Sequence, residues 1–146
     1  MTDGECRAML GAADVGRLAC TLNDQPYIVP IHLDFDGEAL YGFATLGQKI
    51  EWMRHNPLVC VEIDDIATQR QWSSVVVFGQ YEELPPTPEN EDSRSVAARL
   101  IQRHPMWWEP ASVPLASDEP RVPILFRIRI RELTGRRVQH APSALT

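Results

Sequence analysis

The alternation of apolar and charged residues near the C-terminus is the strongest constraint on the fold. A period of two places the apolar side chains on one face of a β-strand, and that face must be buried. A second alternation, in residues 16–22, puts Leu18, Cys20 and Leu22 on one face of another strand. The chain is therefore expected to be mainly β. The C-terminal pattern consists of Ile124, Phe126, Ile128 and Ile130, alternating with Arg127, Arg129 and Arg131.

Turn signals divide the rest of the chain into further short strands. The Asp36–Gly37 pair is typical of a tight hairpin, and residues 64–71 are polar enough to predict a loop. Pro30 cannot donate a ladder hydrogen bond, so it indicates an edge strand or a bulge. The count is about six strands: residues 16–22, 26–34, 39–44, 58–63, 72–84 and 124–131.

Helical segments lie between or beside these strands. Residues 3–13 have apolar residues at helical spacing, and a second helix begins near Gln48 and ends at Asn56–Pro57. Thr87–Pro88 predicts a hydroxyl cap before a third helix. Residues 105–122 carry four prolines and are expected to form an ordered loop, whose Trp107–Trp108 pair either covers a ligand or packs on the barrel. A small antiparallel barrel with packed helices fits this order better than a doubly wound sheet.

Composition limits the function classes. The 146 residues suit one domain with its core in residues 14–133. A net charge of -6 makes duplex binding unexpected, and the chain has neither an apolar run of membrane-spanning length nor a secretory signal, which predicts a cytoplasmic protein. Three unpaired cysteines predict buried thiols in a reducing compartment, and no metal-site or hydrolase spacing is present.

The segment from Tyr41 to Arg54 carries the most chemistry. A strand that ends in Ala44–Thr45–Leu46–Gly47 and leads into a helix at Gln48–Lys49 aims backbone N–H groups, a hydroxyl and an ammonium at one place. Phosphate sites at helix N-termini use these same groups. A helix cap with a solvated lysine is the alternative. The segment lacks the second glycine and the Lys-Ser/Thr pair of a Walker loop.

An ordered set of segments places the chain near a known family. The sequence resembles the FMN-binding split-barrel proteins around pyridoxamine phosphate oxidase, closest to the nitroimidazole-reductase-like branch, most clearly over residues 5–84. The resemblance implies a dimeric six-stranded antiparallel split β-barrel with FMN in the groove between two chains. The segments that carry it are Gly16-Arg17-Leu18-Ala19-Cys20, Pro26-Tyr27-Ile28-Val29-Pro30-Ile31, Asp36-Gly37, Gly47-Gln48-Lys49, Arg54-His55-Asn56-Pro57 and Trp72-Ser73-Ser74-Val75, with Thr134-Gly135-Arg136 a looser match.

The resemblance also implies which residues hold the cofactor. Residues 30–32 would lie along the isoalloxazine ring, the end of the 39–44 strand and the following helix would hold the ribityl chain and phosphate, and Ser74 would meet the polar edge of the ring, near Trp72. The implied cofactor-binding residues are Pro30, Ile31, His32, Gly42, Phe43, Ala44, Thr45, Gln48, Lys49, Trp72 and Ser74.

Departures from the family pattern limit the predicted activity. Gln48 stands where members often have Arg, which removes one phosphate partner, and Phe43–Ala44 stand where many nitroreductase-like members have His-Ser. Counterparts of the C-terminal Trp and Arg of pyridoxamine phosphate oxidase are missing, so vitamin B6 synthesis is not expected. The prediction is a flavin-dependent oxidoreductase acting on a small molecule, without an assigned catalytic residue.

Two other functions remain open on the same fold. A non-catalytic module would bind or sense flavin or haem, with His32 or His55 as the candidate haem ligand. A deazaflavin-dependent reductase would need a more basic groove than a single lysine and a net charge of -6 favour. His32 also suits a solvent-facing or polar position, His55 suits capping of a helix C-terminus, and the arginines of residues 127–131 suit a solvated face or a dimer rim.

Overall fold

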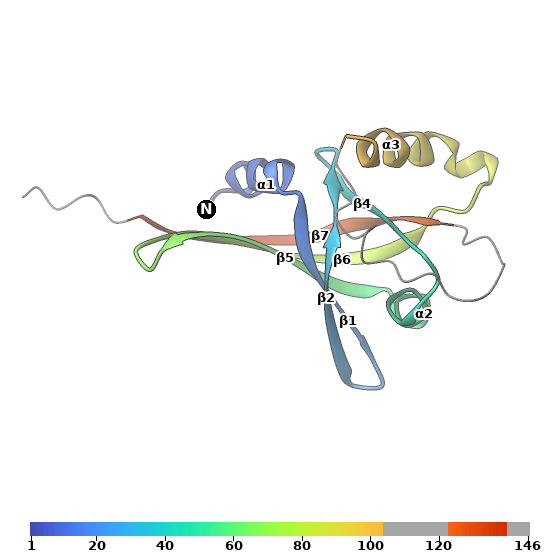
Figure 1. The fold of residues 1–146 in the computed structure, drawn as a ribbon, viewed down its shortest axis with the longest axis horizontal. Coiled ribbons are helices and arrows are strands. Elements are labelled where there is room, and N and C mark those ends of the chain that lie inside the picture. The colour runs from blue at the N-terminus through green and yellow to red at the C-terminus, as the bar shows by residue number, and fades with distance from the viewer. Residues whose placement is uncertain (104–122, 140–146) are drawn as a thin grey trace, which may run out of the picture.

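The computed structural model describes residues 1–103 and 123–139, and within them one antiparallel sheet dominates the fold (Figure 1). Seven strands follow the order β2-β1-β5-β6-β7-β4-β3, and the sheet curls into a half-barrel flanked by helices. The mainly β prediction is confirmed. The elements are α1 (Asp3–Ala12), β1 (Val15–Leu22), β2 (Gln25–His32), β3 (Asp34–Phe35), β4 (Ala39–Ala44), α2 (Gln48–His55), β5 (Leu58–Thr68), β6 (Gln71–Glu83), a 3₁₀ turn (Pro88–Asn90), α3 (Glu91–Ile101) and β7 (Ile124–Gln139).

The structure has seven strands in its described residues rather than the predicted six, because the predicted strand at residues 26–34 is divided into β2 and β3. The chain breaks at Leu33, so that β2 pairs with β1 while β3 pairs with β4 on the far side of the sheet. Within residues 1–103 and 123–139, strand β2 pairs with β1 alone, which confirms that Pro30 lies on an edge strand. The predicted loop at residues 64–71 is wrong, because β5 continues to Thr68 and pairs with β6 almost to the turn.

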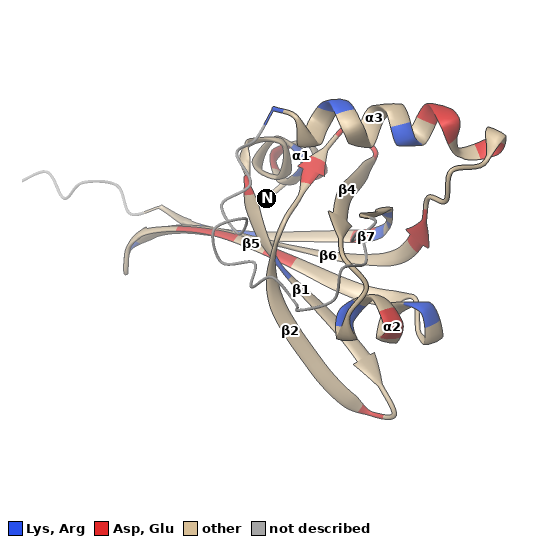
Figure 2. Cartoon of the chain, turned by 45° about the vertical axis from the view of Figure 1, so that its right-hand side comes forward, with Lys and Arg blue, Asp and Glu red and all other residues tan. Residues whose placement is uncertain are grey.

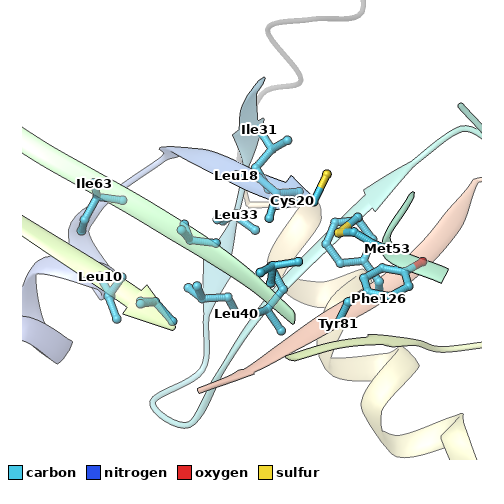
Figure 3. Packing of buried hydrophobic residues seen from close by; sticks show 14 of the residues in the cluster. Leu10, Leu18, Cys20, Ile31, Leu33, Leu40, Met53, Ile63, Tyr81 and Phe126 are labelled. Atoms are coloured by element: carbon cyan, nitrogen blue, oxygen red, sulfur yellow. The ribbon is translucent and has the colours of Figure 1, made fainter. Parts of the chain in front are cut away.

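The main core lies inside the curl of the sheet. Leu18, Val61 and Val77 come from three neighbouring strands and are fully buried, and Ile50 and Met53 of α2 pack against the same cluster. Figure 3 shows Met53, Tyr81 and Phe126 grouped at one end of this core. Helix α3 covers the opposite side of β4, where Ala97 packs with Tyr41 and Leu84.

Helix α2 is attached to the sheet by contacts from its C-terminal half and from its C-cap residue. Trp52 packs on Tyr27 of β2 with ring centroids 5.6 Å apart, and the side-chain amide of Asn56 donates to the Thr21 carbonyl at 3.0 Å. Arg54 forms a two-bond ion pair with Glu83 of β6 at 2.7 and 2.9 Å. These contacts fix the direction in which the N-terminus of α2 points.

Several smaller predictions can be compared directly. Cys20 is buried as predicted, Cys6 is also buried, and Cys60 is half-buried; all three thiols are free. Thr87 does not cap a backbone N–H, since its hydroxyl instead accepts from the Asn90 side chain at 2.9 Å. The predicted loop with Trp107–Trp108 lies outside the described residues. Within the described ranges, the helices are too short and too polar to cross a membrane.

Candidate cofactor site

The N-terminus of α2 has no side-chain cap. Its N-cap residue is Gly47, and the first intrahelical bond runs from the Glu51 amide to the Gly47 carbonyl at 3.1 Å. Helix α1, by contrast, begins with a complete capping box of Thr2 and Glu5. The first-turn amides of α2 therefore lack intrahelical acceptors and carry the positive end of the helix dipole.

Polar residues that suit an anion lie at the start of α2 and just before it in the chain. Thr45 and Gln48 are exposed, while Lys49 is half-buried. Burial lowers the pKa of the Lys49 ammonium, and the nearby Cys20 thiol opposes this shift. A partly desolvated cation attracts an anion more strongly than a fully solvated one. The donor set of amides, hydroxyl, amide side chain and ammonium fits a phosphate group. Figure 2 shows the basic residues of α2 at its two ends, with an acidic one between them.

A second group of predicted residues lies on the other side of the sheet. In antiparallel pairs, directly opposite residues share a face. Arg17 is opposite both Pro30 and Glu62, and the pairing of β5 with β6 then places Ser74 on this same face. We call it the outer face, because Leu18 and Cys20, which have the opposite orientation on β1, point into the core.

Trp72 and Ser74 line a hollow on the outer face. Its other walls include Ile66, Asp64 and Arg17. Arg17 donates from Nη1 to the carboxylate of Asp64 and, at 3.3 Å, to that of Glu62. The pKa of Arg17 is raised, mainly by the charge of Asp64. The hollow thus combines an aromatic wall with a fixed ion-pair cluster.

The remaining predicted residues are mostly buried. His32 is 6% exposed and its Nε2 lies 3.4 Å from the Asp34 carboxylate, so it occupies a polar buried position rather than a solvent-facing one. Ile31 and Ala44 are buried in the core. Gly42 is buried, and an added Cβ there would lie 2.8 Å from Phe126 Cζ. Phe43 is half-buried.

The predicted residues therefore fall into two groups within one chain. Thr45, Gln48 and Lys49 lie at α2, which packs on the core side of β1 and β2. Pro30, Trp72 and Ser74 belong to the outer face. The predicted phosphate end and the predicted ring edge are consequently separated by the sheet.

Three charged residues of the outer-face hollow were not predicted from the sequence. Arg17, Glu62 and Asp64 come from two strands and meet only through the register of β1 with β5. One sequence signal was available: Arg17 is the charged residue in the otherwise apolar alternating segment of residues 16–22. By contrast, the predicted capping role of His55 agrees with the structure, since His55 Nδ1 lies 2.8 Å from the Glu51 carbonyl. Of the C-terminal arginines, Arg129 and Arg131 are exposed as predicted, whereas Arg127 is half-buried and bonds to Glu82 and to Ser93 of α3. No metal-binding group of three ligands occurs among residues 1–103 and 123–139.

Comparison with known proteins identifies the family. The family model described as pyridoxamine 5'-phosphate oxidase matches residues 2–137. The chain belongs to this family. This member is 45% identical over 139 residues to an uncharacterized protein of Rhizobium meliloti (strain 1021), covering 93% of this chain and 92% of the relative.

Solved structures agree with the family assignment. A FAD-binding protein from Mesorhizobium loti superposes with a TM-score of 0.80 at 38% identity, covering 96% of each chain. A putative 5-nitroimidazole antibiotic resistance protein from Bacteroides thetaiotaomicron has a TM-score of 0.67 at 20% identity, covering 92% of this chain and 82% of that one, and shares the fold. The predicted resemblance to the split-barrel family is confirmed.

Proposed function

We propose that this protein binds a flavin nucleotide, FMN, with its phosphate at the N-terminus of α2, and acts as a flavin-dependent oxidoreductase on a small molecule. The observation that carries the proposal is the uncapped first turn of α2 beside the half-buried Lys49. It is supported by the FAD-binding protein of Mesorhizobium loti, which is 38% identical over nearly the whole chain. FMN and FAD share the ring, the ribityl chain and the first phosphate.

FMN is preferred over FAD because of the charge available. Lys49 is the single lysine of the chain, and Gln48 contributes no charge beside it. One cation and one set of helix amides suit one phosphate, whereas the diphosphate of FAD carries a second charged group. When bound, the flavin would supply the redox chemistry, and the protein would bind it, orient it and exclude competing reactions.

The first experiment identifies the chromophore. The freshly purified protein is expected to be yellow and to release about one equivalent of FMN per chain on denaturation, measured by absorbance and mass spectrometry. Release of FAD would correct the choice of nucleotide. A colourless protein that takes up neither nucleotide would refute flavin binding and would favour the haem or deazaflavin alternative.

The second experiment tests the phosphate site. Lys49→Glu should weaken FMN binding strongly but leave riboflavin, which lacks the phosphate, bound as in the wild type. Arg99→Glu is the matched control, because Arg99 is exposed on α3 and the substitution changes the net charge equally. Equal losses for FMN and riboflavin in the Lys49 variant would contradict a phosphate contact.

Turnover separates an enzyme from a binding module. An oxidoreductase should show reduction of its bound flavin by NADH or NADPH under anaerobic conditions, followed by reoxidation with an added acceptor. Flavin that stays oxidised with both donors would favour a module that stores or senses the cofactor.

A homodimer is part of the proposal, and the outer face is its interface. Five large apolar side chains are exposed there: Val15, Ile28, Leu58, Ile66 and Phe78, with exposed fractions from 41% to 68%. By strand register they share one face of the sheet. Contiguous exposed apolar surface marks association sites in soluble proteins. A second copy would cover this face and bring the outer-face residues of one chain towards the α2 site of the other.

The dimer has a direct test. Phe78→Glu should convert the protein to monomers in sedimentation or light scattering and should weaken flavin binding at the same time. Arg99→Glu again serves as the control on a surface away from the outer face. A Phe78→Glu protein that stays dimeric would show that another face makes the interface.

A further inference from the structure

Arg17 occupies a distinctive position on the outer face. It lies between the predicted ring strand and the hollow, since it is directly opposite Pro30 on β2 and opposite Glu62 on β5. Opposite residues in antiparallel strands have Cβ atoms about 5 Å apart. Arg17 also lines the hollow that contains Trp72 and Ser74. One cation therefore adjoins all three outer-face residues predicted to meet the flavin ring.

The guanidinium group of Arg17 is anchored at one end. Both of its hydrogen bonds, to Asp64 Oδ1 and Glu62 Oε2, come from Nη1. Within the described residues, Nε and Nη2 donate no bond, and the side chain is 53% exposed. Arginine has five N–H donors in a rigid plane, so the anchored group still presents a fork of donors. Such a fork matches two neighbouring acceptor atoms on a planar ligand.

We infer that Arg17, held by Asp64 and Glu62, binds the pyrimidine edge of the flavin ring and favours the reduced flavin. The inference rests on the proposed flavin binding. Ser74 is directly opposite Asp64, so the residue predicted to meet the polar edge of the ring adjoins the anchored end of Arg17. The N1 atom and the C2 carbonyl of that edge are the pair of acceptors that the fork fits. In the proposed dimer, Arg17 lies in the same chain and the same hollow as Trp72 and Ser74. It therefore reaches the ring together with them, whichever of the two chains holds the phosphate.

Electrostatics predicts the direction in which Arg17 shifts the midpoint potential of the flavin. Uptake of two electrons and one proton turns the neutral oxidised ring into an anionic reduced ring, with the negative charge centred on the pyrimidine edge. A positive charge beside that edge stabilises the reduced form, and charge near N1 is a recognised means by which proteins tune flavins. Glu62 and Asp64 reduce the effect, but they lie on the far side of the guanidinium from the free donors.

The test uses Arg17→Gln and Arg17→Lys in the full-length protein. Their affinity for FMN is measured by fluorescence titration, and their midpoint potential by equilibration with a reference dye and dithionite. Arg17→Gln is expected to lower the ratio of affinities for reduced and oxidised FMN about tenfold, which is about 30 mV for a two-electron couple. Arg17→Lys should recover most of the potential but little of the affinity, because it keeps the charge and loses the fork.

Controls separate binding from general structural effects. Arg129→Gln removes another exposed arginine, one that is paired with Glu82, and should leave both quantities unchanged. Asp64→Asn should weaken FMN binding in the wild type but not further in the Arg17→Gln background, because Asp64 acts by positioning Arg17. An equal loss in both backgrounds would overturn that positioning role.

Failure of the inference can be distinguished from failure of the proposed function. If the wild-type protein takes up no flavin, the proposed function fails. If the wild type binds FMN, and Arg17→Gln has wild-type affinity and potential, flavin binding stands and the role of Arg17 is refuted. A thermal melt of each variant confirms that the comparison is made between folded proteins.

Discussion

Replacing Gly42 by alanine would test how closely β4 packs against β7, and therefore how firmly the strand leading to the α2 site is held. Gly42 is directly opposite Phe126 in the sheet. An added Cβ would lie 2.8 Å from Phe126 Cζ and 3.1 Å from Cε2. Phe126 is 1% exposed and its ring lies 5.3 Å from that of Tyr81, so it has little room to move.

The expected cost follows from two opposing effects. Overpacking of a filled core costs about 1–3 kcal/mol. Replacing glycine also restricts the unfolded chain, which stabilises the fold by about 0.4–1 kcal/mol. The net destabilisation for Gly42→Ala should be about 1–2 kcal/mol. For a chain of this length, that corresponds to a Tm lower by roughly 3–8 °C.

Urea denaturation and thermal melts measure the effect, and a double-mutant cycle assigns it. Phe126→Leu removes the ring atoms that the new Cβ would meet, so the double variant should be more stable than the sum of the two single changes by about 1 kcal/mol. Gly4→Ala is the matched control, since no atom lies within 4 Å of its added Cβ, and it should stabilise α1 slightly. Additive single changes, or a Gly42→Ala protein as stable as the wild type, would refute this account of β4.

Three further predictions concern α2 and the first hairpin. Gln48→Arg restores the charge that family members often carry, and should tighten FMN binding roughly tenfold in a fluorescence titration while leaving riboflavin binding unchanged. The hydrogen bond from Arg54 lowers the pKa of Glu83 below its ordinary 4.5. The Glu83 carboxylate therefore stabilises the fold above that pH, and its contribution is lost as the pH falls. Glu83→Gln should flatten the acid side of a stability–pH profile from urea melts. Asp24 has φ 62°, so Asp24→Gly should raise the free energy of unfolding by about 0.5–1 kcal/mol, and an unchanged Tm would contradict strain in this turn.

The elements predicted correctly are those with a local signal. Residues 39–44 form β4 as predicted, because the Asp36–Gly37 pair starts the strand and Gly37 has the positive φ of 104° that its turn requires. Helix α2 ends at His55 before Asn56–Pro57. In such segments the sequence within one turn of the chain decides the backbone.

The wrong predictions concern segments whose backbone structure depends on contacts with residues far away in the sequence. Residues 64–68 look like a loop because Asp64 and Asp65 are poor strand formers. In the structure Asp64 faces Arg17 of β1, which neutralises it, and pairing with β6 extends the strand. Strand β7 likewise continues past Arg131 to Gln139, where Arg137 meets Glu5 of α1.

The candidate site shows the same division. The start of α2 at Gln48 and Lys49, where the phosphate is proposed to bind, could be predicted because a helix N-terminus is a local feature. The ring end of the site could not be placed from the sequence, because the face on which Pro30 or Ser74 lies depends on strand register. Arg17 is brought next to these residues by the pairing of β1 with β2 on one side and with β5 on the other.

The two prolines of β2 remove hydrogen-bond donors from its free edge. In the part of the chain that the structure describes, strand β2 pairs only with β1, and Pro26 and Pro30 are both opposite β1 residues that face outward. Residues an even number apart direct their backbone groups to the same side, and a proline is tolerated in a paired strand where its missing N–H would have faced away from the partner. Pro26 and Pro30 therefore both remove donors from the free edge. An edge without regular donors does not recruit another strand, which leaves this side of β2 accessible to a planar ligand whose binding does not need a ladder of hydrogen bonds.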